Sequence, residues 1–261
     1  MKKRCWQLGK TRALHFLCRY EKITYSCLAM PTISENIAQI KSKTEALSSN
    51  VTILAAIKTI PLPQIFEALE AGISMVGESK IQEAKTRVYE IRQKYPSVKI
   101  HFIGHLQTNK INQAISMFDV IESVDSFKLA EAIDKRADKP VEIFIEVNTS
   151  GEASKFGVDL ANAEKLVVRI SALLKNLKIT GLMTIGSFSD NKDKTSACFK
   201  KLKELKYYLN QKGYTGIKHL SMGMSHDFEL AIEECADIIR IGTAIFGERN
   251  YQGGHVNGKF V

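Results

Sequence analysis

The sequence lacks the long apolar runs, cysteine clusters and metal-binding motifs of membrane, disulfide-rich and zinc proteins. No stretch approaches the roughly 20 apolar residues that a membrane helix requires, so no membrane partner is expected. The five cysteines are odd in number, irregularly spaced and form no C-x-x-C pair, which disfavours a disulfide framework. No H-E-x-x-H motif is present. We expect a cytoplasmic protein, because a reducing compartment is the default for such cysteine usage.

Positive charge is concentrated at the start of the chain. The net charge of +9 comes from 37 basic and 28 acidic residues, and seven of the basic residues but only one acidic residue lie within residues 1–29. Residues 30–261 therefore carry a net charge of only +3, and they contain no nucleic-acid-binding motif. The charge does not indicate a DNA- or RNA-binding protein.

Residues 1–29 form a basic leader for which two interpretations stay open. Lys10 and Arg12 interrupt any apolar core of a secretory signal. The segment is basic and poor in acidic residues, as organelle transit peptides are, but it is not rich in serine. We favour the interpretation that translation begins at Met30, because a regular pattern starts immediately after it. We assign the leader no function.

From Met30 onwards, strand-like and helix-like segments alternate. Apolar runs typical of buried parallel strands begin near Val51, Ile73, Lys99, Phe118, Val141, Lys178, Ile217 and Asp237. Helical spacing of apolar residues predicts helices at 35–47, 64–71, 82–94, 108–117, 127–137, 160–174, 195–212 and 227–235. Eight such strands over about 250 residues predict an α/β fold, a single (β/α)8 TIM barrel over residues 30–261. A doubly wound open sheet is the alternative, but no G-x-G-x-x-G follows the first strand.

In a TIM barrel the functional residues follow the carboxyl ends of the strands. Two of these ends hold glycine turns, at Gly223-Met224-Ser225 and Gly242-Thr243, and each turn precedes a helical segment. Such turns expose backbone N–H groups, and two in tandem favour an anion site, most naturally for a phosphate. Ser225 adds a hydroxyl, and Arg240 projects from the strand just before the second turn. For either turn alone, a purely structural role is the favoured interpretation.

Lys58 ends the apolar segment ILAAI at the carboxyl end of the first predicted strand. Burial there disfavours the charged amine and makes the neutral amine available as a nucleophile toward a carbonyl. An isolated lysine at a strand end is usually an ordinary surface residue. Here it shares the predicted ring of loops with a phosphate site and with Arg240. A Schiff-base lysine, a phosphate site and a strand-borne cation together suggest pyridoxal 5'-phosphate (PLP) as the cofactor.

The histidines and carboxylates of the predicted strands do not indicate a metal or an acid–base pair. His101 and His105 in HFIGH lie four residues apart, about 13 Å along a strand, which is too far for one metal ion. We expect His101 to be a packed strand residue and His105 to be a loop residue near the site. Glu78 and Glu122 belong to no pair that is marked as a general acid and base.

Seven motifs give the chain a family resemblance. They read, in chain order, ILAAIKT, GESKIQE, HFIGHLQTNK, EVNTSGEASKFG, GLMTI, LSMGMSHDFELAI and IRIGTAIFG. Together they resemble the pyridoxal-phosphate homeostasis family, small PLP-binding proteins related to the barrel domain of alanine racemase. The resemblance covers about residues 30–251 and implies a barrel of the alanine racemase N-terminal type.

The resemblance also implies a role for each candidate residue. Lys58 would hold PLP as a Schiff base, and Arg240 would face the pyridine nitrogen. Ser225 and the backbone of Gly242 and Thr243 would hold the phosphate. The implied function is PLP homeostasis, in a carrier that supports vitamin B6 and amino-acid balance and passes the cofactor to apo PLP-dependent enzymes.

Three positions depart from the family pattern. Ile57 precedes the lysine where most members have serine or a similar small residue. Ser79 and Lys80 stand where the family has an asparagine and an aromatic residue. These departures concern the lining of one side of the pocket and leave the cofactor anchors in place.

Two other functions share these features. A PLP-dependent amino-acid racemase is the main alternative, but the related racemases use a second, all-β domain that supplies a tyrosine as acid/base. Only about twenty residues follow the last predicted strand here, too few for a domain. A Schiff-base aldolase also combines a lysine with a phosphate site, but the MGMS and RIG motifs disfavour it. We expect a monomeric PLP carrier that is not an enzyme.

Overall fold

The computed structural model describes residues 31–48, 50–187 and 191–248. The basic leader predicted at 1–29 lies outside these residues. The strands are β1 Thr52–Ala56, β2 Met75–Glu78, β3 Lys99–Phe102, β4 Val120–Val124, β5 Val141–Asn148, β6 Val158–Asp159, β7 Leu177–Met183, β8 His219–Met224 and β9 Ile238–Ile241. The helices are α1 Ile33–Leu47, α2 Leu62–Glu70, α3 Ile81–Lys94, η1 Thr108–Lys110, α4 Ile111–Met117, α5 Phe127–Asp134, α6 Leu160–Leu173, α7 Lys192–Gln211, α8 Phe228–Glu233 and α9 Thr243–Phe246.

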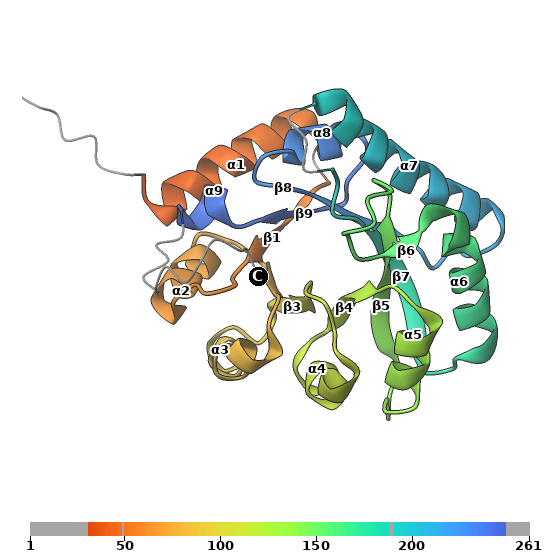
Figure 1. Cartoon of the computed structure of the whole chain (residues 1–261). Coiled ribbons are helices and arrows are strands. Elements are labelled where there is room, and N and C mark those ends of the chain that lie inside the picture. The colour runs from red at the N-terminus through yellow and green to blue at the C-terminus, as the bar shows by residue number, and fades with distance from the viewer. Residues whose placement is uncertain (1–30, 49, 188–190, 249–261) are drawn as a thin grey trace, which may run out of the picture. The chain divides into compact units, whose positions relative to one another are not determined.

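Eight parallel strands close into a barrel that is surrounded by helices (Figure 1). The strand order is β4-β3-β2-β1-β9-β8-β7-β5, and a further pairing between β4 and β5 closes the ring. The structure is therefore a (β/α)8 TIM barrel, as predicted, and not an open doubly wound sheet. The two-residue strand β6 pairs with the end of β5 outside the ring.

The apolar core has two parts, inside the barrel and between the strands and the helices. Successive strand residues point to opposite faces, so each strand contributes to both parts. The interior holds Leu54, Val120, Phe144, Met183 and Ile238. The larger outer core includes the residues that alternate with them, such as Ile53, Ala55 and Ile57 on and after β1. This alternation decides which residues at the strand ends face the barrel axis.

The helix boundaries follow from local capping. Thr32 and Glu35 form a capping box at the start of α1, in which each side chain binds the other's backbone N–H. Pro61 precedes the first residue of α2, as the Pro61-x-Pro63 pattern predicts. Asn191 caps α7 by accepting from Lys194 N at 3.1 Å, which starts this helix three residues before the predicted position.

The predicted strands all occur, and each begins within two residues of its predicted start. The segment predicted as a helix at 108–117 is divided between the 3-10 turn η1 and the helix α4. The strand β6 was not predicted, because two residues are too few to show a period. In the ranges that the structure describes, no helix has the length and apolar character needed to span a bilayer.

Candidate functional site

The mouth of the barrel is the end at which the carboxyl ends of the eight strands meet. Three adjacent strands, β1, β9 and β8, bring the predicted site residues to this end. Arg240 on β9 is in register with Leu54 on β1 and with Met224 on β8. Lys58 follows Leu54 by four residues and lies in the turn two residues past the carboxyl end of β1, at the mouth.

Lys58 lies just past β1, in the turn that leads to α2. Ile57 is fully buried in the outer core. The pKa of the Glu83 carboxyl at the start of α3 is lowered first by Lys80 and also by the Lys58 ammonium, which therefore lies close to it. Lys58 itself is half-buried and makes no ion pair with another described residue. The position of Ile57 also means that its departure from the family pattern does not alter the lining of the mouth.

The backbone after Lys58 is strained. Thr59 has a φ of 64°, a left-handed conformation that is unfavourable for a β-branched residue. Its hydroxyl donates to the carbonyl oxygen of Lys58 at 2.6 Å. Strained residues of this kind persist where the surrounding structure fixes them, and they cluster at functional sites.

The two glycine turns lie against each other, as the phosphate-site prediction requires. The N–H of Ala244 donates to Ser225 Oγ at 3.2 Å, which joins the turn after β8 to the turn after β9. Because Ser225 Oγ accepts this bond, its hydroxyl proton remains available for another acceptor. The N–H groups of Gly242 and Thr243 have no acceptor among the described residues. Three donors are therefore available to an anion.

Arg240 is buried in the barrel beneath these turns, with 5% of its surface exposed. Its Nη1 donates to Ser221 Oγ at 2.9 Å and its Nη2 donates to the carbonyl oxygen of Thr184 at 2.8 Å. Burial lowers the pKa of this guanidinium, and the carboxylates of Glu122 and Glu146 oppose that effect. A guanidinium has five N–H donors, so several remain for a ligand.

A chain of buried polar residues continues from Arg240 across the barrel. Ser221 Oγ donates to Glu122 Oε2 at 2.6 Å, and Glu122 Oε1 lies 2.6 Å from His101 Nδ1. Burial by itself raises the pKa of Glu122, but His101, Arg240 and Ser221 together hold this pKa below its ordinary value. His101 is a packed strand residue, as predicted. Its pairing with Glu122 was missed, although both residues interrupt apolar strands at inward positions.

Glu146 is a second carboxylate inside the barrel. It projects from β5, opposite Met183 in the register with β7, and is 4% exposed. It forms no hydrogen bond or ion pair with another described residue. Burial, assisted by repulsion from Asp125, raises the pKa of Glu146 from 4.5 to about 7. Like Glu122, Glu146 interrupts an apolar strand at an inward position, and this signal could have identified it from the sequence.

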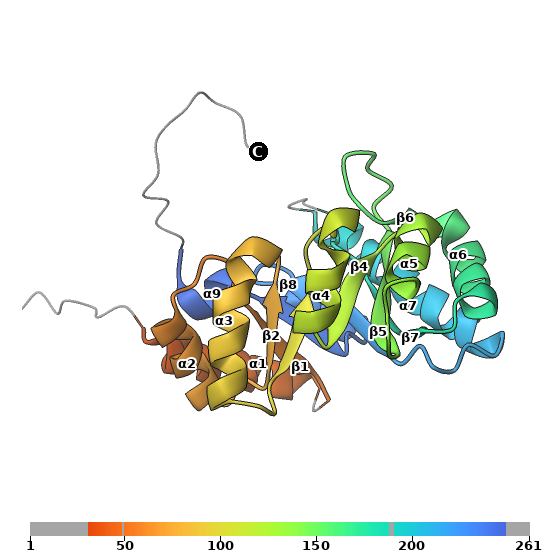
Figure 2. The same ribbon diagram turned by 90° about the horizontal axis from the view of Figure 1, so that it is seen from below.

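The segment between β5 and β6 forms a wall of the mouth. It rises above the carboxyl ends of the strands (Figure 2), and Asn148 holds its base by accepting from the Gly151 N–H at 3.0 Å. Phe156 from this segment stacks on His105 with ring centroids 4.3 Å apart. His105 is therefore a loop residue at the mouth, as expected.

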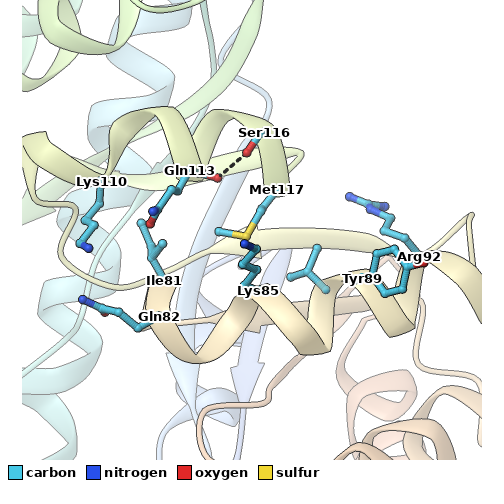
Figure 3. Close-up of a pocket in the computed structure, with 10 residues that line it drawn as sticks. Ile81, Gln82, Lys85, Tyr89, Arg92, Lys110, Gln113, Ser116 and Met117 are labelled. Atoms are coloured by element: carbon cyan, nitrogen blue, oxygen red, sulfur yellow. Dashed lines mark hydrogen bonds between the residues drawn. The ribbon is translucent and has the colours of Figure 1, made fainter.

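A separate groove lies on the outside of the barrel, between α3 and α4 (Figure 3). It encloses about 650 Å³ and is lined by residues such as Lys85, Tyr89 and Lys110. None of the predicted site residues contributes to it. We therefore place the candidate site at the mouth of the barrel and not in this groove.

Comparison with known proteins identifies the family. The family model for the alanine racemase N-terminal domain matches residues 29–250. The pyridoxal phosphate homeostasis protein of Aquifex aeolicus is 38% identical over 229 residues, which cover 87% of this chain and 99% of that protein. The chain belongs to the pyridoxal phosphate homeostasis protein family. The family member from Homo sapiens is 37% identical over 211 residues, which cover 76% of this chain and 77% of the human protein.

Solved structures agree with this family assignment. PipY of Synechococcus elongatus, solved with PLP bound, has a TM-score of 0.75 and 33% identity, with 83% of this chain and all of that chain covered. An alanine racemase from Corynebacterium glutamicum has a TM-score of 0.64 at 14% identity, with 84% and 63% covered. At that identity the likeness to the racemase shows the shared barrel fold alone.

Proposed function

We propose that this homeostasis protein binds PLP at the mouth of the barrel, holds it reversibly as a Schiff base on Lys58, and supports intracellular PLP balance. The observation that carries the proposal is the convergence of three unlike groups on β1, β8 and β9. These are Lys58 just past β1, the donors of the two glycine turns, and the buried Arg240. The family's name and the PLP-bound PipY structure support the same ligand.

Lys58 supplies the covalent anchor in this proposal. PLP brings an aldehyde, which a primary amine can attack with loss of water. The Lys58 amine is half-buried at the mouth, and no carboxylate oxygen of the described residues lies within ion-pair distance of it. Its attachment is reversible, because water or another amine can displace the lysine. A carrier needs this combination of retention and release.

The glycine turns supply the phosphate site. Ser225 Oγ–H and the N–H groups of Gly242 and Thr243 are donors without acceptors among the described residues. Hydrogen bonds from such groups to a phosphate dianion are charge-assisted and stronger than bonds between neutral groups. A phosphate bound there retains the cofactor while the bond to Lys58 is open.

Arg240 is proposed to donate to the pyridine nitrogen. A guanidinium stays protonated at ordinary pH, so it can donate to an unprotonated ring nitrogen but does not help to protonate it. An unprotonated ring withdraws electrons less strongly from a substrate carbon. This arrangement suits a protein that carries PLP without transforming amino acids. Alanine racemases work with the same arginine, so Arg240 by itself does not separate a carrier from a racemase. The racemase alternative is not adopted because the solved racemases share only the barrel fold with this chain.

The remaining parts of the proposal concern the protein's surroundings. We propose that apo PLP-dependent enzymes receive the cofactor, that the protein acts as a monomer, and that it works in the cytoplasm. The described cysteines Cys198 and Cys235 are both free thiols, which suits a reducing compartment. Sedimentation of the purified protein and fractionation of cells test the second and third points.

A transfer assay tests the function. PLP-loaded protein, freed of unbound cofactor, is mixed with the apo form of a PLP-dependent enzyme, and the recovery of that enzyme's activity is followed. We expect recovery to follow release from the carrier. The proposal is contradicted if the loaded protein never yields its PLP, or if the purified protein takes up none.

A further inference from the structure

Glu122 is the buried carboxylate that stands nearest to Arg240 along the hydrogen-bonded chain, yet the two side chains share no direct hydrogen bond. One hydroxyl separates them. Ser221 Oγ accepts from Arg240 Nη1 at 2.9 Å and lies 2.6 Å from Glu122 Oε2. Glu122 is fully buried, so solvent does not screen its charge.

The directions of these bonds are fixed by chemistry. A guanidinium only donates and an ionised carboxylate only accepts. Ser221 must therefore donate its single O–H to Glu122 and accept from Arg240. The second oxygen of Glu122 is occupied by His101 Nδ1 at 2.6 Å. Each member of the chain has one arrangement that satisfies its neighbours, and this holds the Arg240 guanidinium in one orientation.

We propose that Glu122, acting through Ser221, is a positioning residue that fixes the Arg240 guanidinium against the ring nitrogen of bound PLP and balances its charge. His101 holds Glu122 in place from the other side. This inference rests on the proposed function, since it requires PLP at the mouth. It adds residues on β3, β4 and β8 to a site whose predicted anchors lie on or after β1, β8 and β9.

The charge balance has a measurable consequence for bound PLP. Glu146 and Asp227 also act electrostatically on Arg240, but neither accepts a hydrogen bond from its guanidinium. Loss of the Glu122 charge leaves Arg240 under-compensated in a buried setting. The potential at the cofactor then becomes more positive, which disfavours the protonated Schiff base. The pH at which the bound chromophore loses its proton should therefore fall.

The test uses the full-length PLP-loaded protein and the variant Glu122→Gln, which keeps the size of the side chain and one acceptor oxygen but removes its charge. The pH titration of the visible absorption band is measured. We expect the midpoint to fall by about one pH unit or more relative to the unsubstituted protein. The control is Glu142→Gln, which removes an exposed carboxylate at the start of β5 and should leave the midpoint unchanged.

A second variant keeps the test decisive if Glu122→Gln does not fold. Ser221→Ala retains both charges but cuts the connection between them. The resonance of PLP labelled with 15N at the ring nitrogen should move in this variant, because Arg240 loses the acceptor that orients its Nη1. Circular dichroism checks that the variant is folded.

The outcomes separate this inference from the proposed function. If the unsubstituted protein takes up no PLP at the mouth, the proposed function fails. If it takes up PLP and Ser221→Ala leaves the 15N resonance in place, the positioning role of Glu122 is wrong. The positioning role of Glu122 is also wrong if folded Glu122→Gln has the same midpoint as the unsubstituted protein in the pH titration of the absorption band. Neither result would contradict the binding of PLP through Lys58.

Discussion

The buried carboxyl group of Glu146 predicts an unusual dependence of stability on pH. The side chain is 4% exposed and its pKa is raised from 4.5 to about 7, chiefly by burial. In the unfolded chain the carboxyl ionises at its ordinary pKa. Between pH 4.5 and pH 7 the folded state therefore retains a proton that the unfolded state loses.

The sign of the effect follows from this difference. Stability contributed by neutral Glu146 is fully present below pH 4.5 and is lost as the pH rises through 7. At roughly 1.36 kcal/mol per pKa unit, the complete loss amounts to about 3 kcal/mol of unfolding free energy. Most of it falls between pH 5 and pH 8. The magnitude is large beside the roughly 5–15 kcal/mol that stabilises a typical domain.

Glu146→Gln removes the titration and retains the shape of the side chain. We expect the variant to gain about 2 to 3 kcal/mol relative to the unsubstituted protein on going from pH 5 to pH 8. The assay is urea unfolding of the apo proteins at several pH values, with Glu142→Gln as the exposed control. If the difference in unfolding free energy between Glu146→Gln and the unsubstituted protein is the same at pH 5 and pH 8, the reasoning is refuted.

Three further predictions concern the phosphate site, the chemistry and the turn after β8. Pyridoxal without its phosphate should bind far more weakly than PLP, and equal affinities for pyridoxal and PLP would show that the turns bind no phosphate. Ser225→Ala should weaken PLP binding roughly tenfold in a fluorescence titration. PLP-loaded protein incubated with L-alanine in deuterated water should show no Cα exchange or racemisation by NMR, and turnover near 1 per second would instead indicate an enzyme. Gly223→Ala should lower the unfolding free energy more than Gly213→Ala. Both glycines have positive φ, but only at Gly223 would a Cβ meet the Ala231 Cβ; equal losses in urea unfolding would contradict the crowding.

Much of the fold could be predicted from the sequence because each barrel strand is a short apolar run that ends at a polar or glycine residue. Parallel strands deliver their carboxyl ends to one edge of the barrel, and this rule groups Lys58, Ser225 and Arg240 from their sequence positions alone. The structure confirms that the segments carrying them are adjacent in the barrel. Their roles toward PLP stay predictions.

The buried chain behind Arg240 could not be predicted in the same way. Ser221 and Glu122 are 99 residues apart and meet across the interior of the barrel. Which inward side chains face each other there depends on the stagger of the strands, and sequence periodicity does not specify that stagger. The raised pKa of Glu146 could not be predicted for a related reason, since it comes from burial among residues on other strands.

The central claim is that Lys58 holds PLP at the mouth of the barrel. It is tested most directly by reducing the PLP-loaded protein with borohydride and locating the modified peptide by mass spectrometry. We predict that the label lies on Lys58 and that Lys58→Ala loses the visible absorption band. The control variant Lys80→Ala removes an exposed lysine that is paired with Glu83, and it should keep both the label on Lys58 and the absorption band. A label on a different lysine, or an undiminished band in Lys58→Ala, would contradict the account.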